Sequence, residues 1–467
     1  MYRNKVSIII DLRVLDSNPL SDFNKYMYRQ SNILSAKKAI KVILGTALLF
    51  TGSQSFAQET TSHSPYSKFG IGQMREDLLP QTRSMGGIST AIRYQAGLPI
   101  LNIANPASYS GLNRTILEAG LYGNITQLNK GSAQDNTADF AFSHFGFGFA
   151  VARNHGIAFG LMPYSDIGYN ITEMRTMGTI TTKQSKQGEG GLNKAFIGYG
   201  FSPFKGFSVG GNAGFLFGEL KDNLTVSFPT DFNSLNARSQ VTRLVRGLIV
   251  DYGAQYSFPV SRKHNITLGY SGSLNNTVKE KTSQLITRTQ PSADPDFENV
   301  ALDSLPQIGE RTRNINLPMK HNVGITISQG YDWMIGADLK YADWTEYQTR
   351  AGEASLGKNY GVALGGQWKP DAGSNKYWNI VDYRLGVRYN QGHITANNTR
   401  IDDMAVTLGF GLPLPETNFG STSSRINISA EIGQQGTLQN NLVRERYINI
   451  NIGFNINDLW FRRRSYD

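Results

Sequence analysis

The sequence has 467 residues, a formal net charge of +10, 39% hydrophobic residues and no cysteine. Its mean hydropathy of −0.33 excludes a bundle of transmembrane helices, and the lack of cysteine excludes thiolate zinc sites, a disulfide scaffold and a lipoprotein anchor. Residues 1–57 contribute eight basic and three acidic side chains, and no basic stripe with interleaved aromatics follows them. We therefore expect no nucleic-acid partner.

Residues 1–57 have the features of a secretory signal. Three lysines between positions 37 and 41 precede the apolar run VILGTALLFTG, and SQSFA then supplies the small residues of a signal-peptidase site. The pattern predicts cleavage after Ala57. Met27 fits a true start that would shorten the charged extension. The alternative is a buried helix at the start of a soluble domain.

Residues 58–113 contain many turn formers and no sustained alternation. The stretches SPYSKFGIGQ, RSMGGIST and NIANPASYSGLN predict a compact irregular segment, with a short helix near residues 82–94. We treat this segment as separate from the remainder of the chain.

From residue 114 to 467 the pattern has a period of two residues. In VDYRLGVRYN (381–390), apolar and aromatic residues alternate with Asp, Arg, Gly and Asn, so the strand has one apolar and one polar face. Similar stretches predict about fourteen strands, with a polar surface loop at 281–316. No helical periodicity is long enough for crossover helices, which argues against a parallel α/β sheet.

The apolar faces of these strands carry bulky residues, whereas the opposite faces carry Gly, Ala, Asn and Ser. Several strands end in aromatic pairs, such as Trp344 with Tyr347 and Trp460 with Phe461, as in strands that cross a bilayer between aromatic girdles. The sequence therefore predicts an all-β fold, a transmembrane antiparallel β-barrel of about 14 strands. Its small inward residues leave a lumen or make room for a plug. The alternative is a large secreted β-sandwich adhesin.

The stretch RSMGGISTAIRYQAGLPILNIANPASYSGLN, followed by a first strand RTILEAGLYGNI, resembles the FadL-type outer-membrane transporters. That family places an Asn-Pro-Ala element shortly before its first barrel strand, here Asn105, Pro106 and Ala107. SPYSKFGIG and the tail NINDLWFRRR resemble the Bacteroidota branch. The resemblance implies a bacterial outer-membrane barrel (114–467) with an N-terminal plug, or hatch, inside it (58–113).

Catalytic and metal-binding motifs are weak in this sequence. No histidine lies in a G-x-S-x-G elbow or an H-E-x-x-H motif, so we expect no enzyme, no metal and no cofactor. The six histidines are His63, His144, His155, His264, His321 and His393. His144 and His155 could be neighbours across a turn. Asp338, Asp343 and Glu346 form an acidic trio that we interpret as a solvated rim or lumen face rather than a cation site.

The FadL resemblance implies passive uptake of long-chain fatty acids or other hydrophobic compounds, gated by the plug. Asn105, Pro106 and Ala107 would shape the hatch, and Arg384 and Arg388, on the polar face of one strand, are candidate contacts for an anionic ligand. The alternative is a non-transporting barrel subunit of a secretion or outer-membrane assembly complex with envelope protein partners. An apolar pocket behind the plug would favour transport, and a packed polar interior would favour the subunit role.

Overall fold

The computed structural model describes residues 64–459, except for 96, 179, 230, 232–233, 291–300, 350–355 and 416–422. The predicted signal segment, Met27, His63 and the aromatic pair at 460–461 lie outside the described residues. Within the described part of the chain, no helix is long and apolar enough to cross a membrane.

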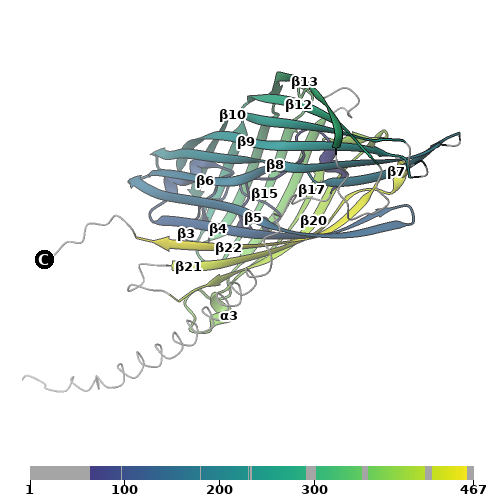
Figure 1. The fold of residues 1–467 in the computed structure, drawn as a ribbon. Helices are drawn as coiled ribbons and strands as arrows, with labels where there is room; N and C mark the ends of the chain where they lie inside the picture. The colour runs from purple at the N-terminus through teal and green to yellow at the C-terminus, as the bar shows by residue number, and fades with distance from the viewer. Residues whose placement is uncertain are drawn as a thin grey trace, which may run out of the picture. The chain divides into compact units, whose positions relative to one another are not determined.

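A closed antiparallel β-barrel makes up most of the described chain (Figure 1). Its wall segments are β4 (Thr115–Lys130), β5 (Ala133–Ala152), β6 (His155–Asp166), β7 (Tyr169–Met177), β8 (Ile180–Phe204), β9 (Phe207–Ser227), β10 (Asn236–Pro259), β11 (His264–Ser273), β12 (Thr277–Thr289), β13 (Ala301–Asn316), β14 (Met319–Gln329), β15 (Trp333–Asp343), β16 (Lys358–Trp368), β17 (Asp382–Gln391), β20 (Asp403–Pro413), β21 (Ser423–Gly436) and β22 (Arg444–Asp458).

Three of these segments continue a preceding strand after a short interruption. β6 and β7 both pair with β8, β11 and β12 both pair with β10, and β13 and β14 pair with β12 and β11 in the same order. The wall segments therefore form fourteen strands, and β22 pairs with β4 to close the ring. The predicted strand number and antiparallel arrangement are confirmed.

The alternation in β17 sorts side chains between the two faces of the wall. Leu385, Val387 and Tyr389 are exposed on the outside, whereas Asp382 and Arg384 are buried inside. Exposed Phe, Ile, Leu and Val side chains recur on the outer faces of the other wall strands. Because a water-soluble protein rarely exposes so large a continuous apolar surface, this belt is suited to contact with lipid.

Short elements and turns form residues 64–113, which we call the N-terminal segment. They are η2 (Pro65–Lys68), β1 (Gln73–Met74), α2 (Pro80–Arg83), β2 (Tyr94–Gln95), β3 (Leu98–Pro99) and η3 (Pro106–Gly111). The helix predicted near 82–94 is wrong in extent, because α2 ends before Gly86 and Gly87, which have φ values of 69° and 81°. Such left-handed glycines end helices.

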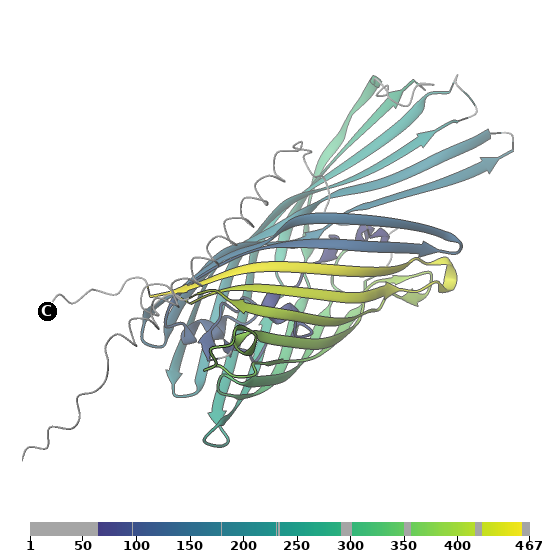
Figure 2. The same ribbon diagram turned by 90° about the horizontal axis from the view of Figure 1, so that it is seen from below.

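Inward-facing glycines bring the wall into backbone contact with the N-terminal segment, whose purple elements lie inside the ring of strands (Figure 2). A Cβ atom on Gly210 of β9 would lie 2.4 Å from the Pro106 carbonyl oxygen, and one on Gly386 of β17 would lie 2.1 Å from the Gly86 nitrogen. Any larger side chain would collide with these backbones. The small inward residues therefore accommodate a folded interior segment.

The wall is not paired along its whole height. β5 pairs with β6 only between Phe145 and Ala152, and the described residues of β7 pair with β8 but not with β5. β1 pairs with the last two residues of β6, Ser165 and Asp166, at the level where β5 and β6 separate. We call this interval between β5 and β7 the seam. It lies directly beside the N-terminal segment.

The prediction of a surface loop at 281–316 is wrong. These residues belong largely to β12 and β13, which together with β7, β8, β9 and β10 extend one side of the wall (Figure 2). Their polar residues on both faces gave no amphipathic signal, because strands that project into water have no apolar surface to face. Register shifts between β12 and β13 weakened the alternation further.

The aromatic pair Trp344 and Tyr347 is buried inside the barrel, so its predicted place in an outer girdle is wrong. Trp344 stacks on His393 with ring centroids 4.5 Å apart, and it contacts Tyr347 edge to face. Both join an apolar cluster with Tyr66 and Ile71 of the N-terminal segment. The residues that directly follow β15 and β17 therefore pack inward against the N-terminal segment. The other short elements are α3 (Tyr377–Ile380), β18 (Thr395–Ala396), β19 (Thr399–Arg400) and η4 (Gln439–Asn441).

Candidate functional site

A cavity of about 310 Å³ lies inside the barrel, between the N-terminal segment and the wall. Eleven charged side chains from both parts contribute to its lining, beside apolar and aromatic residues such as Tyr164 and Trp344. The charged side chains are Arg75, Glu76, Asp77 and Arg83 of the N-terminal segment, and Asp251, Lys320, Lys340, Arg388, Asp403, Glu431 and Glu445 of the wall. Charges of opposite sign are therefore intermixed in a lining that also contains apolar side chains.

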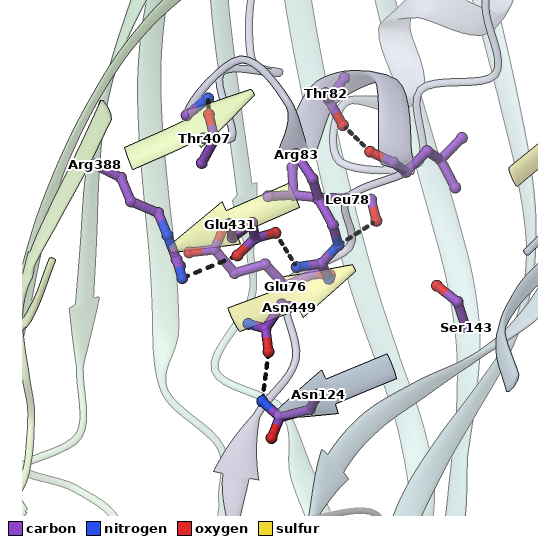
Figure 3. Close-up of polar contacts among 12 residues, drawn as sticks. Glu76, Leu78, Thr82, Arg83, Asn124, Ser143, Arg388, Thr407, Glu431 and Asn449 are labelled. Atoms are coloured by element: carbon purple, nitrogen blue, oxygen red, sulfur yellow. Dashed lines mark hydrogen bonds and ion pairs between the residues drawn. The ribbon is translucent and has the colours of Figure 1, made fainter. Parts of the chain in front are cut away.

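Glu431 of β21 is the centre of one group of ion pairs (Figure 3). Its carboxylate lies 3.5 Å from the Arg83 guanidinium and 3.2 Å from that of Arg388. Arg388 also lies 3.5 Å from Asp403 and donates a 2.9 Å hydrogen bond to the Tyr447 hydroxyl. Because Arg83 belongs to α2, this buried carboxylate links the N-terminal segment to two wall strands.

Glu76 supplies a second link between the segment and the wall. Its carboxylate accepts a 2.7 Å hydrogen bond from the Lys340 ammonium of β15. Burial alone would raise the pKa of Glu76, but the charges of Lys340 and Arg388 outweigh it and lower the pKa to about 2. Glu76 is therefore ionised at neutral pH and stays paired with the Lys340 ammonium.

Two further pairs fix the segment beside the seam. The Arg75 guanidinium lies 2.5 Å from the Asp166 carboxylate at the end of β6. The buried Lys194 ammonium of β8 pairs with Asp77 and lies 3.5 Å from Asp251 of β10. A buried charge is strongly destabilising without its partner, so each pair resists separation of the segment from the wall.

The two arginines predicted as ligand contacts occupy different environments. Arg384 donates 2.8 Å hydrogen bonds to Gln367 and Asn427 and lies 3.3 Å from Asp382, and it is not part of the cavity lining. Arg388 does line the cavity, where its guanidinium contacts protein carboxylates. A role in binding an anionic ligand stays a prediction for both.

Asn105 connects η3 both to the rest of the N-terminal segment and to the barrel wall. Its side-chain oxygen caps η3 by accepting a 3.1 Å hydrogen bond from the Ala107 nitrogen, and its amide donates a 2.6 Å bond to the Thr90 carbonyl. Longer bonds of 3.4 and 3.3 Å run from the same amide to the carbonyls of Ala254 and Tyr270 in the wall. Pro106 follows at the first position of η3, where no backbone donor is needed.

The model of a family described as BamG matches residues 39–467. The chain belongs to the BamG family. A search of the curated proteins finds no match to it.

Solved structures place the BamG-family chain in the FadL-type fold. The Pseudomonas putida toluene transporter TodX is 15% identical with a TM-score of 0.55, and the match covers 82% of this chain and 98% of TodX. The CymD monoaromatic hydrocarbon channel is 14% identical with a TM-score of 0.53, over 84% and 100% of the two chains. A Pseudomonas aeruginosa FadL homologue is 11% identical with a TM-score of 0.53, over 83% and 99%. The FadL resemblance is thus confirmed at the level of fold, and these neighbours are channels and transporters rather than enzymes.

Asp338, predicted to lie on a solvated rim or a lumen face, lies on the lumen face and contacts the N-terminal segment. In this BamG-family chain it is buried on β15, and its carboxylate accepts bonds of 2.7 and 2.9 Å from the backbone nitrogens of Ser89 and Thr90. The Thr90 hydroxyl donates a third bond of 2.8 Å. A lone Asp on the inward face of a strand was the available signal, but only the three-dimensional path of the N-terminal segment identifies its partners.

The predicted proximity of His144 and His155 is not found. His155 pairs in register with Ala152, and its ring contacts Tyr199, whereas His144 lies further along β5 and is buried beside Ser143. The register shift at the end of β5 does not bring the rings together. Among the residues that the structure describes, no cluster of three or more His, Asp or Glu side chains could hold a metal ion.

Proposed function

We propose that this chain is an outer-membrane barrel that serves as a subunit of an assembly or secretion complex for envelope proteins, with its lumen blocked by the N-terminal segment. The observation that carries this proposal is the composition of the lumen. Charged groups from the segment and the wall converge on a cavity of about 310 Å³ and neutralise one another. A hydrophobic compound entering that space would have to displace ion pairs without replacing their interactions, which is unfavourable.

The segment acts as a plug in this proposal, and Asn105, Pro106 and Ala107 act as its anchor. Asn105 reaches wall carbonyls on two strands, and Gly210 allows the backbone of Pro106 to touch β9. The apolar outer belt supports a location in the bacterial outer membrane, where lipid would surround the barrel. The charged residues of the lumen then stabilise the closed state, in which the plug is in place, and they do not select a transported compound.

The experiment is depletion of this chain in its host, followed by two measurements on the same cells. We expect the folded fraction of other outer-membrane barrels, scored by heat-modifiable gel mobility, to fall. We expect uptake of a radiolabelled long-chain fatty acid and of radiolabelled toluene to stay unchanged. Normal barrel assembly in depleted cells would contradict the proposal. The chain purified from cross-linked membranes should also carry defined envelope proteins in fixed stoichiometry.

The second candidate function is passive uptake of long-chain fatty acids or other hydrophobic compounds, and the seam is the observation that favours it. Along β5 from Ala133 to Phe142, the described wall offers no partner on the β7 side, and Phe140 and Phe142 are exposed there. A compound released from the lumen could pass sideways into lipid through such an interval. Plug gating would then depend on β1, which occupies the edge of β6.

This candidate has its own test. A bifunctional thiol reagent with a cleavable disulfide spacer, joining Ala138→Cys of β5 to Asn170→Cys of β7 across the seam of the cysteine-free chain, should block uptake of the labelled compounds and leave barrel assembly intact. Reduction of the disulfide should restore uptake. Uptake that is equal in cross-linked and reduced cells contradicts the transport function and leaves the subunit function standing.

A further inference from the structure

Two basic residues face each other on the outer surface of the barrel. Arg246 of β10 and Lys279 of β12 are directly opposite in the register of the sheet, and both side chains are exposed. The buried residues Val245 and Val278 precede them on their strands, so both basic side chains point outward. Side chains at directly opposed positions have Cβ atoms about 5 Å apart.

This pair has no counter-charge within the described chain. The next outward residue of β12, Lys281, lies 2.8 Å from the Glu310 carboxylate, and nearby Lys221 lies 3.5 Å from Glu219. Arg246 and Lys279 form no such ion pair or hydrogen bond with any described residue, in contrast to these neighbours. Opposed like charges destabilise a sheet. An anion bound between them would remove that repulsion.

The position of the pair indicates which anion it meets. On the side towards the start of β4 and the end of β22, the next outward residue of β10 is Leu248, which is 70% exposed, and the direct neighbour of Arg246 on β9 is Phe217. On the other side of the pair, Leu244 is flanked by the charged residues Glu219 of β9 and Lys281 of β12, so the basic pair lies where charged residues begin to interrupt the apolar belt. In a membrane-spanning barrel this border is the level of the lipid headgroups.

We propose that Arg246 and Lys279 form a binding site for a phosphate group of a membrane lipid, whose acyl chains lie along Leu248 and Phe217. The site goes beyond the proposed function and rests only on the membrane location proposed above. The guanidinium of Arg246 presents a planar fork of donors to two phosphate oxygens, and the Lys279 ammonium supplies a point charge to the third. The lipid would be held on the outer wall, away from the lumen and the seam.

The test compares lipid binding by the full-length chain and its variants in mild detergent, by native mass spectrometry with monophosphoryl lipid A as the probe. The double variant Arg246→Gln with Lys279→Gln should bind roughly 30-fold more weakly, because each basic side chain at an anionic lipid surface contributes about fivefold. The matched control is Arg238→Gln, on the same strand and face but about 27 Å nearer the strand tip. It should bind like the unmodified chain.

Three results would overturn the proposal. They are unchanged binding by the double variant, equal weakening by Arg238→Gln, and displacement of the lipid by millimolar inorganic phosphate, which would identify a site for the free anion. Heat-modifiable gel mobility equal to that of the unmodified chain shows that each variant is folded. Because none of these substitutions touches the lumen, failure here is distinct from failure of the assembly function.

Discussion

A substitution at Gly210 tests how the N-terminal segment fits inside the barrel. The segment either packs closely against the wall or occupies the lumen without close contact. A Cβ atom at this position would lie 2.4 Å from the Pro106 oxygen and 2.8 Å from the Ala107 nitrogen. Both are backbone atoms, so no flexible side chain can move aside, and a shift of about 1 Å is required. Overpacking of this kind costs about 1–3 kcal/mol. Gly210→Ala should therefore weaken the docking of η3 by about 2 kcal/mol.

The adjacent residue is an internal control. A Cβ atom on Gly211, which faces outward on the same strand, would come no closer than 3.6 Å to the Asp251 oxygen. Gly211→Ala should be neutral or slightly stabilising, because it restricts the unfolded chain. The assay is the rate of trypsin cleavage within residues 64–113 in mild detergent, where a loss of about 2 kcal/mol predicts roughly 30-fold faster cleavage. Equal protection of the two variants would refute close packing as the role of Gly210.

The remaining predictions concern the polar contacts. Arg388→Gln leaves Glu431 with fewer counter-charges and should lower stability by about 3 kcal/mol, visible as a lower unfolding temperature; an unchanged temperature would show that the pair is not needed. Burial, and then a nearby lysine charge, lowers the pKa of His393 from 6.5 to about 4, so the neutral ring stabilises the fold above pH 6.5 and this contribution is lost as the pH falls towards 4. The fluorescence of Trp344 should change as His393 becomes protonated near pH 4, and His393→Gln should abolish the change. Asn105→Ala should cost about 2 kcal/mol through loss of the cap and of buried hydrogen bonds, measured by the same trypsin assay.

The barrel could be predicted from sequence because lipid and lumen impose opposite demands on alternate residues. Leu385 and Arg384 are adjacent in the chain yet face different surroundings, so the period of two is preserved wherever a strand crosses the apolar belt. Where β12 and β13 project beyond that belt, both faces meet a polar environment and the pattern disappears. The length of the strands was therefore less predictable from the sequence than their number.

The interior was predictable only in outline. Small residues on the inward faces indicated a lumen or a plug, but Asp338 gave no sign that it would hold the backbone of Thr90, because that contact spans 248 positions. Trp344 was assigned to an outer girdle because aromatic residues at strand ends have the same sequence signal on either face. Arg388 was placed on the inward face correctly, whereas its carboxylate partners lie on β20 and β21 and could not be read from its own strand.

The continuity of the chain between Leu112 and Thr115 makes the interior segment a tethered occupant of its own lumen. If its ion pairs break, the segment cannot diffuse away, and it competes for its place at an effective concentration of about millimolar or more. Any opening of this barrel is therefore brief and self-reversing unless another molecule holds the segment outside. A partner that keeps the pore open must bind either the displaced segment or the lumen surface that the segment leaves. Its binding must outcompete the rebinding of the tethered segment to the lumen.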